Sequence, residues 1–437
     1  SLSGRFFGEG LQKLPFLQTL SLSRNNLSGP ISIGHVSREL RRLDLSHNMF
    51  SGPLPSIFAA SFTRLKSLDL SHNLLTGTIS PQLFGAPHED SNGGPSSMPA
   101  LHYLSLAGNS LDGPIPDTIA LCSNLRLLNL SSNRLTDMVP PSLEALPELA
   151  VLDLSYNFLS GPLPPLHIPS LLTVSLQSNR FSGPIPSRIF SDSSSLQYLD
   201  LSNNLISGTL PESLQTLTSL STLNMAHNSI NGDLPSWIGS LTSLKTLGLG
   251  FNLLSGQLPS TLGLLKDLVA MDLSHNLLHG EIPDTLSECD ELKAMDLSSN
   301  ALNGTLPSIL PAGLTSLNLS KNSLRSHGLA EGFYSECGLL EVLDLSGNKL
   351  SGILPPILPC PRMEYLNLSY NSFSGGIPGF PRNSVVTTID LSHNGLYGGI
   401  PTSIGHASLV STMLLDHNKL SGSIPHEIGN CSSLTNM

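Results

Sequence analysis

The chain has 437 residues, of which 12% are charged and 5% aromatic, with 38 glycines and 33 prolines. Its net charge of -11 disfavours a nucleic-acid partner, because phosphate binding needs clustered Lys and Arg. No run approaches the ~20 apolar residues that a membrane span requires, so any membrane contact is expected through a segment outside these residues.

A single pattern, LxxLxLxxNxLxG, repeats along the chain from its first residues to its last. Most spacings between successive pattern asparagines are 22 to 26 residues. That period is typical of leucine-rich repeats, in which each turn supplies one short strand and stacked turns share a core. The asparagines in register are Asn25, Asn48, Asn73, Asn109, Asn133, Asn157, Asn179, Asn204, Asn228, Asn252, Asn276, Asn300, Asn322, Asn348, Asn371, Asn394 and Asn418.

One turn, residues 268–283, shows how the pattern predicts structure. Alternation along a strand places Leu268, Met271, Leu273 and Leu278 inward. The residues expected on the outward side or at the strand end are Val269, Ala270, Asp272, Ser274 and His275. Asn276 leaves the strand with an amide able to pair buried backbone groups, which predicts an asparagine ladder.

The Gly-Pro-Ile-Pro elements at 113–116 and 183–186 resemble the plant-specific class of leucine-rich repeats. This resemblance implies a right-handed superhelical solenoid with a parallel β-sheet on its concave face. Most members are ectodomains of receptor-like kinases and receptor-like proteins. Residues 1–29 are similar to the subfamily of inflorescence and root apices receptor kinases, some of whose kinase domains are thought inactive.

We therefore expect a single array over residues 1–437, with about 17 complete repeats and a partial repeat at each end, cut from a longer protein. A loop insertion is predicted at 85–99, where the asparagine spacing rises to 36 residues. This loop is either a tolerated surface insertion or a short counterpart of the island insertions of some plant receptors. A second break, 326–331, predicts a local change of curvature.

The five cysteines, Cys122, Cys289, Cys337, Cys360 and Cys431, each lie three residues before the first Leu or Met of a repeat. One shared structural position indicates small buried residues rather than a metal site, which needs ligands at close spacing. Adjacent turns would bring Cys337 and Cys360 about 5 Å apart, which permits a disulfide. Two free thiols are the default expectation.

Repeated polar residues explain the apparent catalytic groups. Aspartates such as Asp272 and Asp296 arise from the recurring LDLS string, and histidines such as His275 and His417 share the place before the pattern asparagine. No phosphate loop, GxSxG, HExxH or kinase motif occurs. We predict no catalytic residue, no metal and no cofactor, although the resemblance allows a kinase domain, active or inactive, in the full-length protein.

The leading functional hypothesis is the extracellular ligand-recognition domain of a plant cell-surface receptor. Its expected partners are a peptide or other small extracellular ligand and a leucine-rich-repeat co-receptor kinase. The alternative is a secreted inhibitor of cell-wall hydrolases, resembling the polygalacturonase inhibitors, whose arrays are shorter. Many peptide receptors of this kind carry an Arg-x-Arg pair that holds the ligand carboxylate, and this chain has none.

Sequons for N-linked glycans predict an extracellular location and narrow the ligand surface. They occur at Asn26, Asn129, Asn303, Asn318, Asn367 and Asn430. Glycans at 129, 318 and 367 would project over the sheet, which leaves residues 149–300 as the longest open stretch. Departures from the LDLSHN string in this window are the candidate ligand-binding residues: Tyr156, Gln177, Tyr198, Asn203, Asn224, Thr246, Gly248 and Phe251.

Overall fold

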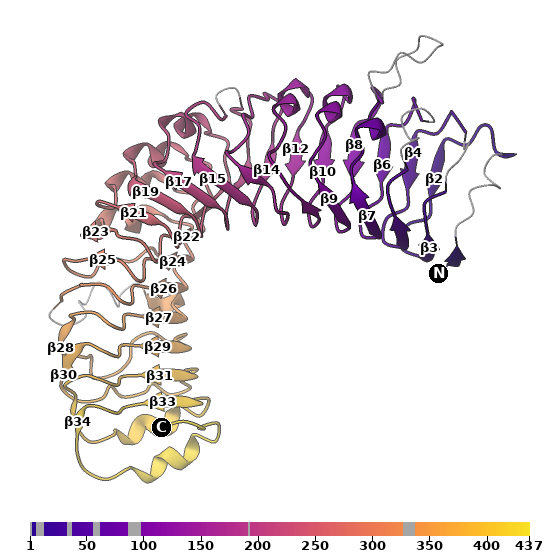
Figure 1. Ribbon diagram of the computed structural model, residues 1–437. Helices are drawn as coiled ribbons and strands as arrows, with labels where there is room; N and C mark the ends of the chain where they lie inside the picture. The colour runs from indigo at the N-terminus through magenta and orange to yellow at the C-terminus, as the bar shows by residue number, and fades with distance from the viewer. Residues whose placement is uncertain are drawn as a thin grey trace. The chain divides into compact units, whose positions relative to one another are not determined.

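The computed structural model describes residues 2–5, 13–32, 37–55, 62–85, 98–190, 193–326 and 337–437. Within these ranges the chain forms two compact units, Ser1–Asn228 and Ser229–Met437. Each unit is a stack of repeat turns whose short strands lie side by side, as β8, β10 and β12 do in Figure 1. The prediction of one array running through both units stays a prediction.

The first unit carries a parallel sheet of one strand per turn, each strand pairing in register with the next. The strands are β2 (Thr19–Ser21), β4 (Arg42–Asp44), β6 (Ser67–Asp69), β8 (Tyr103–Ser105), β10 (Leu127–Asn129), β12 (Val151–Asp153), β14 (Thr173–Ser175), β16 (Tyr198–Asp200) and β18 (Thr222–Asn224).

The second unit repeats this arrangement with the same parallel register. Its strands are β20 (Thr246–Gly248), β22 (Ala270–Asp272), β24 (Ala294–Asp296), β26 (Ser316–Asn318), β27 (Val342–Asp344), β29 (Tyr365–Asn367), β31 (Thr388–Asp390) and β33 (Thr412–Leu414). The two sheets together thus supply one strand before each of the pattern asparagines.

A second set of short strands follows the asparagines, except for its first strand, which precedes Asn25. In the first unit these are β1 (Ser3–Arg5), β3 (Asn26–Gly29), β5 (Met49–Gly52), β7 (Leu74–Thr78), β9 (Ser110–Gly113), β11 (Arg134–Leu135), β13 (Ser160–Gly161), β15 (Arg180–Pro184) and β17 (Leu205–Gly208). In the second unit they are β19 (Ser229–Asp233), β21 (Leu253–Ser255), β23 (His279–Gly280), β25 (Ala301–Leu302), β28 (Ser351–Ile353), β30 (Ser372–Ser374), β32 (Tyr397–Gly398) and β34 (Lys419–Leu420).

Many turns then close through a short 3₁₀ helix, and seven of the helices in the described residues start directly after the proline of an Ile-Pro or Leu-Pro step. Pro283 takes φ -66° and ψ 131°, an extended conformation that suits a residue without an N–H donor. The helices are η2 (Pro81–Leu83), η3 (Asp117–Leu121), η4 (Pro141–Ala145), η5 (Glu212–Thr216), η6 (Ser236–Ser240), η7 (Ser260–Leu264), η8 (Asp284–Glu288), η9 (Cys337–Leu339), η10 (Thr402–His406) and η11 (His426–Asn430). None of the helices within the described ranges has the length and apolar character needed to span a bilayer.

The leucines form the core as the alternation predicts. Leu268, Leu273 and Leu278 are fully buried and Met271 is 2% exposed. Of the two places predicted for Ser274, the outward side and the strand end, the structure shows the strand end: β22 stops at Asp272, and Ser274 is buried with its N–H donating to Asp272 Oδ1 at 2.9 Å. The strand has ended by then, so alternation no longer governs the side chain.

The asparagine ladder is present, and each member links two turns. Asn276 Nδ2 donates to the carbonyl oxygens of Leu273 and Ser274 in its own turn, at 3.1 and 3.0 Å, and to that of Leu249 in the preceding turn, at 3.0 Å. Its Oδ1 accepts the N–H of Leu254 at 2.9 Å. One side chain therefore pairs four backbone groups that the fold buries.

The residue immediately before each ladder asparagine, which we call the pre-ladder residue, adopts a left-handed conformation. In fifteen turns it is not glycine, and its φ lies between 51° and 56°. Such a backbone is costly for most residue types, so the neighbouring turns must hold it. This conformation sets the pre-ladder side chains in a row beside the sheet, and the rings of His47 and His72 stack there at 4.3 Å.

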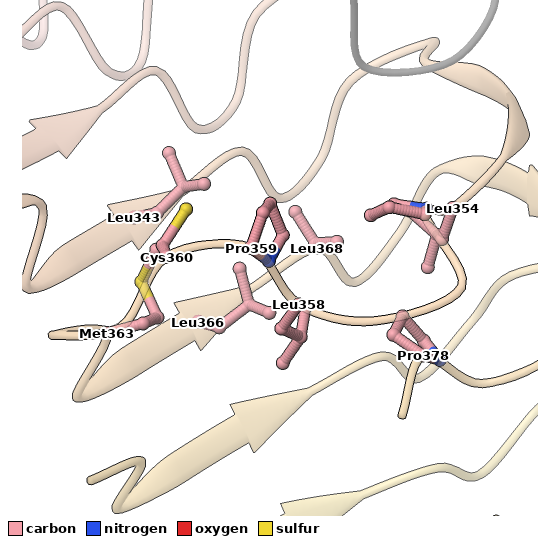
Figure 2. A pocket seen from close by; sticks show the side chains of 10 residues that line it. Leu343, Leu354, Leu358, Pro359, Cys360, Met363, Leu366, Leu368 and Pro378 are labelled. Carbon is pink, nitrogen blue, oxygen red and sulfur yellow. The ribbon is translucent and has the colours of Figure 1, made fainter. Parts of the chain in front are cut away.

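Cys337 and Cys360 form a disulfide with their Cα atoms 5.3 Å apart, so the default expectation of two free thiols is wrong for this pair. The adjacent turns supplied the required approach. Cys122, Cys289 and Cys431 are free and buried, as predicted from their shared position. An apolar cavity of about 10 Å³ lies beside the disulfide, lined by residues such as Leu366 (Figure 2). It is roughly the size of one water probe, so it belongs to the core and not to a ligand site.

Two sequence predictions concern segments that the structure mostly leaves out. Residues 86–97 of the predicted loop at 85–99 lie outside the described residues, as do residues 327–331 of the second break.

Candidate functional site

The eight candidate residues fall into two groups of positions rather than one. Tyr198, Asn224, Thr246 and Gly248 are strand residues that alternate with buried leucines. The other four follow the strands: Tyr156, Asn203 and Phe251 are pre-ladder residues with left-handed backbones, and Gln177 precedes a pre-ladder serine. The first five candidates in sequence belong to the first unit and the last three to the second, so each unit is described by itself.

In the first unit, Tyr198 and Asn224 converge on one carboxylate oxygen. The Tyr198 hydroxyl donates to Asp200 Oδ2 at 3.3 Å, and Asn224 Nδ2 donates to the same atom at 3.1 Å. Parallel pairing of β16 with β18 sets Asp200 directly opposite Asn224. Burial, followed by the nearby Asp200 carboxylate, raises the pKa of the Tyr198 hydroxyl, so this group stays a neutral donor at physiological pH. We call Tyr198, Asp200 and Asn224 the Asp200 cluster.

Tyr156 and Asn203 stand beside this cluster in the pre-ladder row. The side chain of Tyr156 is exposed, at 58%, and the Asn203 side chain is exposed as well. Gln177 lies between them in the chain, and its carbonyl accepts the Tyr156 N–H at 2.9 Å. Within the part of the chain that the structure describes, Gln177 Oε1 is a buried acceptor without a donor. An incoming N–H or O–H group could satisfy it.

In the second unit, Thr246 and Gly248 pair in register with Ala270 and Asp272, so small side chains lie next to a carboxylate on the sheet. Phe251 is 42% exposed, and its ring stacks on His275 with centroids 4.1 Å apart. This stack covers part of the neighbouring turn. The three candidates therefore form a shallow, mostly uncharged strip ending in an aromatic ring.

Strand alternation places the recurring aspartates on the outward side of the sheet, but not all of them face solvent. Asp44 and Asp200 are 8% and 6% exposed. Asp44 accepts the N–H and hydroxyl of Ser46 at 3.2 and 2.7 Å, and the Ser21 hydroxyl at 3.2 Å. Its pKa is lowered: burial alone would raise it, but the bonds from Ser46 and Ser21 and the nearby Arg42 outweigh burial. These carboxylates support the turn that follows the strand.

The predicted glycan positions are all within the described residues. Asn129, Asn318 and Asn367 take the strand place that other repeats give to Asp, and each accepts bonds from the N–H and hydroxyl of the serine two residues later. Asn26, Asn303 and Asn430 are exposed. Whether these asparagines carry glycans stays a prediction.

Sequence reasoning missed one basic hollow in the second unit. Asn303, Arg325 and Lys349 line an open depression of about 560 Å³. Arg325 and Lys349 come from separate turns at unrelated pattern positions, so only the fold brings them together. A glycan on Asn303 would lie in this hollow.

Comparisons with known proteins agree with this geometry. Models described as leucine rich repeat match residues 99–159 and 169–230, and single-repeat models match 16–35, 39–60, 64–86, 267–289, 339–360, 362–384, 386–407 and 410–431. The crystal structure of a TDR receptor is similar over 100% of this chain and 78% of that chain, at 30% identity and a TM-score of 0.86. The chain belongs to the leucine-rich-repeat ectodomains of plant receptor kinases.

Two further members of this ectodomain family are informative. The Arabidopsis receptor kinase HAESA, solved with the peptide hormone IDA and the co-receptor SERK1, is 29% identical with a TM-score of 0.77, over 100% of this chain and 80% of that one. A protein named "Probably inactive leucine-rich repeat receptor-like protein kinase" from Arabidopsis thaliana is 52% identical over 84 residues, which is 19% of this chain and 8% of the kinase. The narrower subfamily resemblance of residues 1–29 stays a prediction.

Proposed function

We propose that this chain is the extracellular recognition domain of a plant cell-surface receptor and binds a peptide across the outward face of its sheet. The observation that carries the proposal is the Asp200 cluster, in which the half-buried Tyr198 and Asn224 side chains converge on the buried Asp200 carboxylate beside the exposed Tyr156 ring. HAESA, a relative of the same fold, has been solved with a peptide hormone. Fold alone does not give function, so the argument depends on the residues.

The charges of this surface favour a particular peptide chemistry. From β12 to β18 the outward strand positions include Asp153 and Asp200 and contain no Lys or Arg. A free ligand carboxylate would find no cation there, whereas a neutral or basic segment would meet the half-buried Asp153 carboxylate. Four strands at ~4.8 Å spacing span about 14 Å, enough for roughly four extended residues. The strip of Thr246, Gly248 and Phe251 offers a second contact in its own unit.

A co-receptor is part of the proposal because HAESA was solved with both its peptide and SERK1. A peptide that lies on the sheet keeps one side exposed to solvent, so a co-receptor can contact the bound peptide directly. We accordingly place the chain on the extracellular side of the plasma membrane. The disulfide between Cys337 and Cys360 is consistent with an oxidising compartment.

The test uses the purified chain against pools of synthetic secreted plant peptides with free and amidated C termini, with cell-wall oligosaccharides and a fungal polygalacturonase as separate arms. We expect a neutral or basic peptide to bind. Binding of the polygalacturonase alone would favour the inhibitor function instead.

Variants then locate the surface. Tyr198→Ala should weaken peptide binding at least about tenfold, ~1.4 kcal/mol, because it removes the ring and one donor to Asp200. Phe251→Ser tests the second unit with a residue that other turns accept at the pre-ladder place, as at Ser178. Phe158→Ala is the matched control, because Phe158 is a 44% exposed aromatic that lies under Arg180 and away from the strand positions. Loss of binding in this control with none in Tyr198→Ala would overturn the proposal.

A further inference from the structure

The last two pre-ladder histidines of the chain face a carboxylate that no other turn supplies. His417 Nδ1 lies 2.6 Å from Asp416 Oδ2, and His393 Nε2 lies 3.9 Å from the same oxygen. The three ligand atoms are all within 4.8 Å of one another. All three residues belong to the second unit.

Asp416 departs from the repeat in a specific way. The residue two places before the ladder asparagine is Ser in most turns, as at Ser392, and otherwise Ala, Gly or Gln. Only before Asn418 is this residue an aspartate. The pre-ladder residue of its own turn, His417, and that of the preceding turn, His393, are both histidines. The pattern that gives the array its pre-ladder histidines does not account for this carboxylate.

We propose that His393, Asp416 and His417 form a binding site for a divalent transition-metal ion, with Zn²⁺ as the reference ion. Two imidazole nitrogens and one carboxylate oxygen are a donor set that suits zinc and copper and disfavours calcium or magnesium, which prefer oxygen. Three protein donors leave a fourth tetrahedral position for water or for a donor from a partner. This site is independent of the proposed peptide surface.

The backbone around the three ligands is already fixed. Asn418 Nδ2 donates to the carbonyl oxygens of Leu391, Leu415 and Asp416 at 2.9, 3.0 and 3.2 Å, which ties the two ligand-bearing turns together. The N–H of His393 also donates to the carbonyl of Asp416 at 3.0 Å. Binding of an ion would therefore need to fix only the side-chain rotamers of the three ligands.

The ligand atoms are already close together, but the imidazole rings must rotate before their nitrogens can point at one ion. The rings of His393 and His417 stack with centroids 4.0 Å apart and 12° between planes, so their nitrogen lone pairs lie in nearly parallel planes and do not converge on one point between the rings. Donors around a tetrahedral zinc lie about 3.3 Å apart, given bonds of ~2.0 to 2.1 Å. His417, with 67% of its side chain exposed, has room to turn toward the carboxylate. His393 is held by the Tyr370 ring, stacked on its other face at 4.0 Å.

The first unit contains a natural control for this geometry. His47 and His72 are also stacked pre-ladder histidines from adjacent turns, at 4.3 Å and 12°. Their turns carry Ser46 and Ser71 where the second unit has Asp416, and the Ser46 hydroxyl donates to Asp44. The pair therefore reproduces the two imidazoles without the neighbouring carboxylate.

The experiment titrates the tag-free chain with ZnCl₂ by calorimetry and by competition with a chromophoric chelator. We expect one site that Asp416→Ser weakens at least tenfold. Ser is the residue of most other turns, and Ser at a pre-ladder place keeps the left-handed backbone, as at Ser299, so His417→Ser and Asp416→Ser should fold normally. Circular dichroism and thermal melting verify this. The double variant His47→Ser/His72→Ser should bind zinc like the parent chain.

Several outcomes would overturn the site. They are no zinc binding by the parent chain, unchanged affinity in Asp416→Ser, an equal loss in the His47 and His72 control, or CaCl₂ binding with the affinity of ZnCl₂. An anomalous diffraction peak between His393 and His417 in zinc-soaked crystals would support it directly, and a peak elsewhere would refute the assignment.

Discussion

Replacing Asn276 with Ala tests the part of the fold that every turn shares. Asn276 is 6% exposed, and its side chain pairs four backbone groups, including the N–H of buried Leu254. Ala fills less space and offers no acceptor, so the Leu254 N–H would be buried without a partner. An unsatisfied buried donor costs about 1 to 3 kcal/mol. The same reasoning applies to Asn252, whose Oδ1 accepts the N–H of Ile230 at 2.9 Å.

The magnitude should appear locally, because each repeat contacts only its neighbours and stability is distributed along the stack. Native-state hydrogen exchange read by mass spectrometry is therefore the assay of choice. A loss of 1 to 3 kcal/mol corresponds to about 5- to 150-fold faster opening of the affected segment. We expect this in peptides covering β21 (Leu253–Ser255) and the turn that contains Asn276.

Asn231→Ala provides the matched control. Asn231 is an exposed asparagine in β19, so the same substitution there leaves no buried group unpaired, and exchange should stay within about twofold of the parent. If Asn276→Ala left exchange at Leu254 unchanged, the ladder would not be stabilising these backbone groups and the reasoning would fail.

Three further outcomes follow from the cysteines and the sequons. Burial raises the pKa of Cys122 to about 12 and that of Cys289 to about 11, so both should resist iodoacetamide at pH 8 in the folded chain and react after denaturation. Since the folded state favours the neutral thiols, their contribution to stability is present below the ordinary thiol pKa and is lost as the pH rises toward these values; a melting temperature flat from pH 8 to 11 would argue against it. The Cys337–Cys360 disulfide should appear as a 2 Da mass difference on reduction, and Cys337→Ser/Cys360→Ser should cost about 2 to 4 kcal/mol, measured by chemical denaturation. Protein from its native source should carry N-linked glycan on at least one of the six sequons by glycopeptide mass spectrometry, and none at all would contradict the extracellular assignment.

The repeat itself could be predicted from the sequence because its physics is local. Inward leucines, the ladder asparagine and Gly280 with its φ of +82° each follow from one turn of pattern. Alternation says nothing of side chains beyond the strand end, such as that of Ser274, which is buried. It also failed to show that Asp200 folds back under hydrogen bonds instead of facing solvent, since that depends on the side chains of the next strand.

The candidate site was predictable only as a set of departures from the pattern. Tyr198 and Asn224 are 26 residues apart, and register alone brings them to the same oxygen of Asp200. The strand spacing predicted that Cys337 and Cys360 lie close enough to form a disulfide, but it could not show whether the two sulfurs are bonded. The sequence shows Asp416 as the one aspartate at the position two places before a ladder asparagine. Its role as a metal ligand can be proposed only from the structure, in which histidines of two turns lie close to its carboxylate.

The pre-ladder row explains why chemistry gathers beside the sheet in this fold. The ladder asparagines fix the backbone on one side of each pre-ladder residue, and the strand fixes it on the other, so the side chain can change from Ser to His, Tyr, Phe or Lys while φ stays between 51° and 56°. Adjacent turns then hold such side chains about 4 Å apart, close enough for rings to stack, as His393 and His417 do. A position that is rigid in its backbone and free in its identity is suited to recognition, because binding then costs little conformational entropy. Tyr156 and Phe251 in the peptide proposal and the two histidines of the metal proposal are all pre-ladder residues, so both proposals depend on a backbone that the ladder asparagines of the same unit hold in place.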